Sequence, residues 1–235
     1  YDVSPFRANA NLSFAGPPTW DAGLGGLGLR FNGTTDYQDV GNLPHLGANL
    51  LGPLTLLAVV IPDDGTRGDI VTKWGVAGQR QYDLLQGVNA GKFAFFLTSS
   101  AASLKTSGPS TISIVAGQRY AVAGKYDGTF ISVHVDGIRE NDTNIGSLTL
   151  QEGTTTSTRI GSDSNTPLNA FAGIIEQAII SNRPWSDSEI YKWAQDPFGP
   201  FRMEDIAPWA TVAAPGVSQA FRYPYHKSLR AALAG

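Results

Sequence analysis

Glu176 is the residue that a predicted strand of this chain places best for acid or nucleophilic catalysis. A retaining glycosidase needs two such carboxylates on one face, about 5 to 5.5 Å apart. Residues two positions apart share a face of a strand, and the second residue after Glu176 is Ala178. One carboxylate cannot fill both roles. We therefore expect Glu176 to be a structural carboxylate, paired with an arginine such as Arg30 or Arg183, and we assign no catalytic residue.

The sequence also offers no catalytic motif built on histidine or cysteine. The chain has three histidines, His45, His134 and His226, and no cysteine. His134 alternates with valines in a predicted strand, which is typical of a packed or solvated sheet residue. The sequence contains no G-x-S-x-G elbow, no phosphate-binding loop and no zinc pair, and the lack of cysteine excludes thiolate sites and disulfides. The chain is therefore predicted not to be an enzyme.

Aspartates in predicted turns are the candidate metal ligands, because calcium takes several oxygen ligands from loops. They are Asp36, Asp39, Asp63, Asp64 and Asp163. We assign Asp36, Asp39 and Asp163 as the candidate site, although each also suits a turn former. None of the five has the spacing of an EF-hand loop. The chain thus requires no cofactor, and calcium stays an open alternative.

Aromatic side chains with neighbouring amides are the candidate sugar ligands. Sugar sites combine apolar ring surface with a few polar groups that fix orientation. Two pairs are suitable: Trp74 with Tyr82, and Tyr37 with Asn165. The competing interpretation is that tryptophans and tyrosines in such a chain fill a core or an interface.

Short strands must position these side chains. The run from Leu54 to Ile61 is almost wholly apolar between prolines, which predicts a strand buried on both faces. Further strands are predicted over 69–74, 82–86 and 93–98, and Asp127-Gly128 predicts a hairpin between 120–125 and 130–135. We interpret Phe93, Phe95 and Phe96 as core residues rather than as a ligand platform.

A strand followed by a capped helix ends the folded part. The strand is predicted over 174–181, and Ser186 with Glu189 forms a capping box that starts a helix. Trp185 and Ile190 have the spacing of a hydrophobic staple. The helix should end near Gln195, because the next residue precedes a proline.

Four segments resemble, in order, laminin G-like domains of the concanavalin A type. They are LRFNGTTDYQDV at 29–40, YAVAGKYDGTFISVHVDGIR at 120–139, RIGS at 159–162 and FAGIIEQAIISNRPWSDSEI at 171–190. The resemblance implies an all-β fold: a two-sheet antiparallel β-sandwich, or jelly roll, with one short C-terminal helix and an extended tail. The family has an Asp-Glu pair where this chain has Glu176 and Gln177, so an inherited acidic site is not implied.

Composition suits one such domain with extensions. The chain has 235 residues, 42% hydrophobic and 16% charged, with 27 glycines and 14 prolines. We predict an N-terminal arm over 1–19, the sandwich over 20–196 and a docking tail over 197–235. Leaving a large apolar side chain exposed costs roughly 1.5 to 3 kcal/mol, so the aromatic residues of the tail should be covered by a partner. They are Phe198, Phe201, Trp209, Phe221, Tyr223 and Tyr225.

These features favour a non-catalytic structural and surface-recognition module of a multi-subunit particle, such as a phage virion decoration or adhesion protein. A free-standing carbohydrate-binding module is the alternative, and a glycoside hydrolase relative is less favoured. The expected partners are other subunits, in an oligomer or assembly, and a surface glycan. A net charge of −3 favours neither nucleic acid nor anionic lipid, and the apolar run at 54–61 is too short to span a membrane. We expect the protein at the virion or extracellular surface.

Overall fold

The computed structural model describes residues 11–13, 19–23, 26–89, 91–153, 155–163 and 169–199. Several candidate residues of the sequence analysis lie outside these ranges, so their roles stay predictions. They are Asn165, Phe201, Trp209, Phe221, Tyr223, Tyr225 and His226. In the part of the chain that is described, no helix has the length and apolar character needed to cross a membrane.

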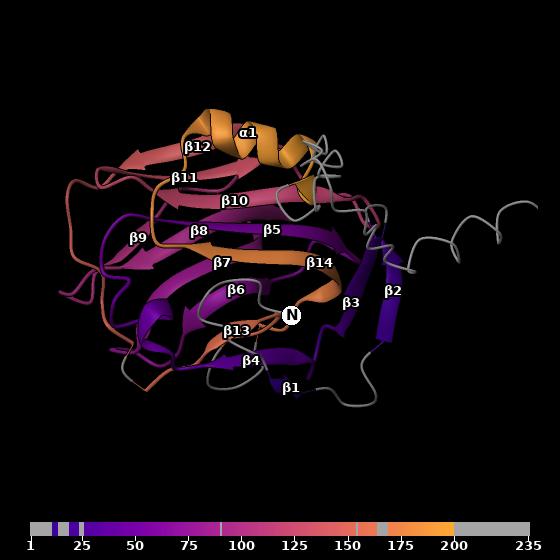
Figure 1. Ribbon diagram of the computed structural model, residues 1–235, viewed down its shortest axis with the longest axis horizontal. Coiled ribbons are helices and arrows are strands. Elements are labelled where there is room, and N and C mark those ends of the chain that lie inside the picture. The colour runs from indigo at the N-terminus through magenta and orange to yellow at the C-terminus, as the bar shows by residue number, and fades with distance from the viewer. Residues whose placement is uncertain are drawn as a thin grey trace, which may run out of the picture. The chain divides into compact units, whose positions relative to one another are not determined.

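Two antiparallel sheets form the molecule, which confirms the predicted β-sandwich (Figure 1). In spatial order, sheet A contains β1 (Asn11–Ser13), β4 (Tyr37–Gly41), β13 (Thr158–Ile160), β6 (Gly68–Trp74), β7 (Arg80–Val88), β8 (Lys92–Thr98) and β9 (Leu104–Thr106). Sheet B contains β12 (Ile138–Asn144), β11 (Phe130–Val135), β10 (Tyr120–Tyr126), β5 (Leu54–Pro62), β14 (Ala172–Ser181), β3 (Gly26–Asn32) and β2 (Thr19–Gly23). A 3₁₀ turn at Pro44–Leu46 and the helix α1 (Asp187–Gln195) complete the elements.

The main core lies between the two sheets. Alternate residues of β5, including Leu56 and Val60, pack against inward residues of β7 and β8 such as Leu84 and Phe95. Leu57 and Val59, on the other face of β5, belong to a second apolar cluster beneath α1. Every residue of β5 is buried, because the strand is covered on both faces. The prediction for this strand is confirmed.

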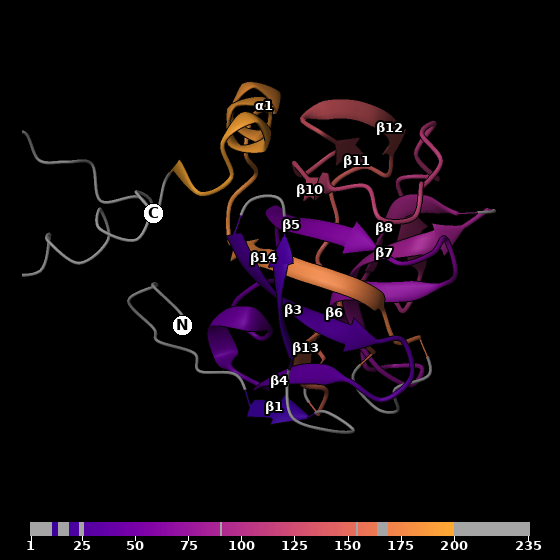
Figure 2. The same cartoon turned by 90° about the vertical axis from the view of Figure 1, so that its right-hand side faces the viewer.

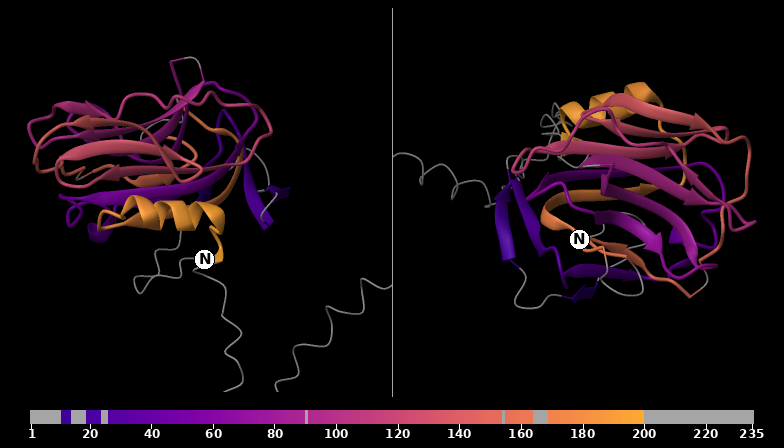
Figure 3. Two further views of the ribbon diagram at one scale, coloured as in Figure 1. Left: turned by 90° about the horizontal axis from the view of Figure 1, so that it is seen from above. Right: turned by 180° about the vertical axis from the view of Figure 1, so that it is seen from behind.

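Helix α1 covers the outer face of sheet B. Ile190 and Trp193 pack with residues of β5 and β10, and Figures 2 and 3 show the helix alongside β10 to β12. The capping box is present: the Ser186 hydroxyl accepts from the Glu189 amide at 3.2 Å, and the Glu189 carboxylate accepts from the Ser186 amide at 2.7 Å. The helix ends at Gln195 as predicted.

Local turn chemistry also follows the sequence. The Asp127 side chain accepts hydrogen bonds from the amides of Thr129 and Phe130 at 2.9 and 2.7 Å, which closes the β10–β11 hairpin. At the next turn both Asp136 and Gly137 have positive φ, 50° and 84°, as the two central residues of a tight hairpin require. Both aspartates therefore act as turn formers.

Three interpretations of the sequence need correction. Glu176 does pair with an arginine, but the partner is Arg119, at 2.8 Å; Arg30 and Arg183 bind other carboxylates. Residues 11–13 of the expected N-terminal arm form β1, which pairs with β4 in sheet A, because an edge strand offers unpaired main-chain groups. Phe96 is absent from the core cluster that holds Phe93 and Phe95, since adjacent strand residues point to opposite faces.

Candidate functional site

A row of polar and aromatic residues crosses the outer face of sheet A, the face opposite the core. Strand register places Asp39, Arg159, Thr72, Asp83 and Phe96 side by side on β4, β13, β6, β7 and β8. Their sequence neighbours on β7 and β8 belong to the core, so these five face away from it. The one α-helix of the described residues covers sheet B instead. Thr72 and Asp83, in the middle of the row, are fully buried, so the partly exposed ends of this face, around Arg159 and Phe96, form the candidate recognition surface.

Arg159 organises one end of this face. Its guanidinium carbon lies 4.1 Å from the centre of the Tyr37 ring, its Nε lies 3.4 Å from the Asp39 carboxylate, and a terminal nitrogen donates to the Asp163 carbonyl at 2.8 Å. Stacking on an aromatic ring and pairing with a carboxylate hold the guanidinium in place. Three residues assigned from the sequence, Tyr37, Asp39 and Asp163, thus meet around one arginine that the sequence analysis did not select.

Aromatic and basic side chains alternate at the other end. The rings of Trp74 and Phe96 lie 6.3 Å apart, tilted by 48°. The guanidinium of Arg80 lies 5.3 Å from the Trp74 ring, and that of Arg67 lies 5.8 Å from the Phe96 ring. Trp74 is only 8% exposed, whereas Phe96 is half-buried. Phe96 therefore offers the ring surface, and Trp74 supports it from the side.

Two buried carboxylates lie beneath this aromatic group. Asp69 and Asp83 are both fully buried and share Arg67, at 3.1 and 3.3 Å. Burial in a low-dielectric environment is the main cause that raises the pKa of each carboxyl, and Arg67 opposes it. Asp163 adds a further negative charge that raises both pKa values. The two carboxylates hold the Arg67 guanidinium against the Phe96 ring. Because both are fully buried, a ligand in solvent cannot contact them.

The remaining sequence candidates do not join the face as predicted. Tyr82 is fully buried, and its hydroxyl bonds the Leu46 carbonyl and the Thr158 hydroxyl at 2.9 and 3.0 Å. It is a core residue and cannot stack on a sugar. Asp36 lies in the turn before β4, where its carboxylate accepts from the Asn32 amide at 3.1 Å. In the described ranges, no group of three or more His, Cys, Asp or Glu side chains could hold a metal ion, and the candidate calcium site stays a prediction.

Residues that the sequence analysis missed carry much of the site. Arg159 on β13 is far along the chain from Thr72 on β6 and Asp83 on β7, and only strand pairing brings it beside them. The available signal was parity, which places Thr72 and Trp74 on one face of β6. Applying parity to Phe95 and Phe96 would also have placed one of them outside the core.

The sequence matches a model of the Concanavalin A-like lectin/glucanases superfamily over residues 32–191, about two thirds of the chain. The chain belongs to this superfamily. The matched span contains every residue named above on the outer face of sheet A and ends within α1. The laminin G-like resemblance of the four sequence segments is thereby confirmed. No curated protein matches the chain.

Several solved structures have a similar fold. The binding domain of Paraclostridial Mosquitocidal Protein 1 has a TM-score of 0.67 and 12% identity, over 84% of this chain and 49% of its own. This chain thus spans about half of that domain. Domain 4 of AbnA, an arabinanase from Geobacillus stearothermophilus solved with arabinotriose, has a TM-score of 0.58 and 18% identity, over 77% of this chain and 82% of its own.

A third structure is the CBM40 of the Ruminococcus gnavus IT-sialidase, bound to α2,3-sialyllactose. It has a TM-score of 0.60 and 15% identity, over 71% of this chain and 96% of its own. At these low identities the likeness describes the fold. This superfamily member thus has a lectin-like sandwich of the type found in carbohydrate-binding and receptor-binding domains.

Proposed function

We propose that the chain is a non-catalytic recognition module that binds glycans through the outer face of sheet A. The observation that carries this proposal is the gathering of Tyr37, Phe96 and two ring-stacked arginines on one face that the helix leaves uncovered. Half-buried rings supply apolar surface for a pyranose, and guanidinium and carboxylate groups bind hydroxyls. The sandwiches solved with arabinotriose and sialyllactose support the same class of ligand.

The placement of three carboxylates, two on this face and Glu176 on sheet B, favours binding over hydrolysis. A glycosidase acid must reach the glycosidic oxygen. Asp69 and Asp83 are fully buried and bound to Arg67, and the Glu176 side chain is buried against Arg119. None of these three acids is placed to contact a sugar that approaches from solvent.

Alanine substitution tests the face. Phe96→Ala and Tyr37→Ala should each weaken affinity for a glycan found on an array by about tenfold, which is about 1.4 kcal/mol. Phe130→Ala is the matched control, because Phe130 is a partly exposed aromatic residue on β11 of the other sheet. Calorimetry measures the affinities. Binding that survives both substitutions, or an array on which the full-length protein binds no glycan, would contradict the proposal.

We also propose a narrower role, as a surface or decoration subunit of a larger particle such as a virion, with residues 197–235 docking on a neighbouring subunit. The sequence observation that favours it is the set of large aromatic residues among prolines after α1. The first of them, Phe198, is half-buried and directly follows the helix. The arm at 1–19 would act as a second contact, outside the strand that joins sheet A.

Solution mass tests this role. The full-length chain should sediment as an oligomer, and the triple variant Phe221→Ser, Tyr223→Ser, Tyr225→Ser should shift toward monomer because it removes apolar surface from the contact. Tyr191→Ser is the control, since Tyr191 is an exposed aromatic residue of α1. Monomers for both the full-length chain and the triple variant, with equal stability, would refute the docking role.

A further inference from the structure

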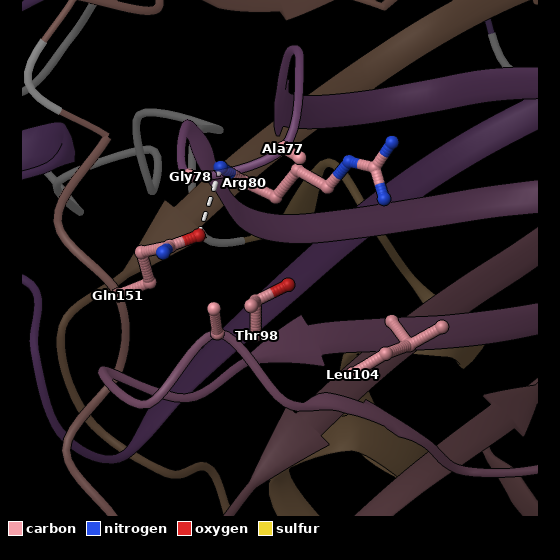
Figure 4. Close-up of a pocket in the computed structure, with 7 residues that line it drawn as sticks. Ala77, Gly78, Arg80, Thr98, Leu104 and Gln151 are labelled. Atoms are coloured by element: carbon pink, nitrogen blue, oxygen red, sulfur yellow. Dashed lines mark hydrogen bonds between the residues drawn. The ribbon is translucent and has the colours of Figure 1, made fainter.

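A small hollow adjoins the outer face of sheet A, beside the turn between β6 and β7 (Figure 4). Its volume is about 70 Å³. Its lining residues are Ala77, Gly78, Arg80, Thr98, Ala102, Leu104 and Gln151. Pockets that enclose a whole small molecule usually measure about 300 to 1,000 Å³, and a water molecule occupies about 30 Å³. The hollow therefore suits one functional group of a ligand whose body lies outside it.

Arg80 is the cation of this hollow. Its Nε donates to the Gly75 carbonyl at 3.0 Å, and its guanidinium lies over Trp74. Among the described arginines it alone forms no ion pair with a carboxylate. The others, each of which does, are Arg30, Arg67, Arg119, Arg139, Arg159 and Arg183. No aspartate or glutamate lines the hollow. Arg80 thus presents terminal N–H groups without a local counter-charge.

Two further polar side chains line the hollow. Thr98 is only 4% exposed, and its hydroxyl oxygen has no hydrogen-bond partner among the described residues. Leaving such a buried group unpaired costs about 1 to 3 kcal/mol. The Gln151 side chain accepts from the Arg80 amide through Oε1 at 3.2 Å, which directs its Nε2 amide away from that bond. Figure 4 shows both side chains beside the hollow.

We infer that this hollow binds the carboxylate of an acidic sugar. A carboxylate is planar and fits the fork of a guanidinium with two N–H···O bonds, and one of its oxygens can also accept from the Thr98 hydroxyl. The inference rests on the proposed glycan-binding function and names the ligand class of that surface. Arg80 joins the two regions, because it lies over Trp74, which packs against Phe96. Leu104, 52% exposed, gives apolar surface for the sugar ring at the rim.

Matched acidic and neutral probes test the assignment on the full-length chain. We expect 3′-sialyllactose or an oligogalacturonate to bind at least about tenfold more tightly than lactose or a galacto-oligosaccharide of equal length. Arg80→Gln should abolish this preference, so that the acidic and the neutral probe bind this variant with equal affinity. Arg183→Gln, which makes the same charge change on an exposed arginine before α1, should preserve it. Thr98→Val replaces the hydroxyl by a methyl group and should weaken the binding of the acidic probe alone. This variant provides the test if Arg80→Gln fails to fold.

The outcomes separate the two proposals. If acidic and neutral probes bind equally and Phe96→Ala weakens both, the hollow is not a carboxylate site, although the glycan-binding face remains. If no saccharide binds, both proposals fail. Lactose sulfated at the position of the sialic acid distinguishes the anion: equal affinity for the sulfated and the sialylated probe would overturn the assignment to a planar carboxylate.

Discussion

Replacing Phe95 by alanine is expected to lower the free energy of unfolding by about 3 to 5 kcal/mol, the usual cost of deleting a buried aromatic side chain. Phe95 is fully buried and belongs to the main core. It packs across the sandwich onto β10, where a Cβ added at Gly124 would meet its ring at 2.4 Å. The missing ring leaves a cavity that the opposed sheets cannot close, because a strand backbone lies on the other side. Urea unfolding measures the loss.

The neighbouring residue provides the matched control. Phe96→Ala removes the same atoms from the next position, but its half-buried ring lies on the outer face of sheet A. We expect it to cost less than half as much stability as Phe95→Ala and to reduce glycan affinity, whereas Phe95→Ala should leave binding intact in the folded fraction. Equal losses of stability for the two variants would show that both rings belong to the core.

Features set by neighbouring residues in the sequence could be predicted. The capping box of Ser186 and Glu189, the turn at Asp127 and the burial of β5 all depend on residues within a few positions of one another. Such features follow from local backbone geometry and from apolar runs. The order of four segments was enough to indicate the superfamily, because each one marks a strand or turn of the same sandwich.

The site could not be predicted in the same way. Arg159 meets Tyr37 and Asp39 only because β13 pairs with β4, more than a hundred residues away in the chain. Strand register decides which side chains meet, and register is set by the whole sheet. Glu176 illustrates the same difficulty. An arginine partner was expected because a lone carboxylate suits a structural role, but only the fold shows that this partner is Arg119.

The two outer faces of the sandwich differ in what covers them. On sheet B, small and aliphatic residues such as Ala121 and Ala123 let α1 pack closely, and the helix removes that face from solvent. On sheet A, ion pairs and ring contacts hold Arg67 and Arg159 in place without a covering helix. An arranged polar face of this kind loses little side-chain entropy when a ligand binds, which supports recognition there.

At the edge of the helix-covered face, His134 should make stability depend on pH. It is fully buried, and burial lowers the pKa of its imidazole to about 4. The nearby charges are those of Asp187 and Asp142, which raise this pKa, and of Lys125 and Arg139, which lower it. In the unfolded chain, the His134 imidazole is protonated at pH values below about 6.5, the ordinary pKa of histidine. In the folded chain, the same imidazole stays neutral down to about pH 4. In that window the unfolded state binds more protons, so stability falls as pH falls.

The non-titrating variant His134→Asn isolates this effect. From about pH 7.5 to about pH 5, the native protein should lose about 2 kcal/mol more stability than the variant, as the linkage relation gives for these pKa values. A constant cost of the substitution cancels, because the comparison is between two pH values. If His134→Asn and the native protein lost equal stability over this pH range, the pKa of His134 would have to be the same in the folded and the unfolded state.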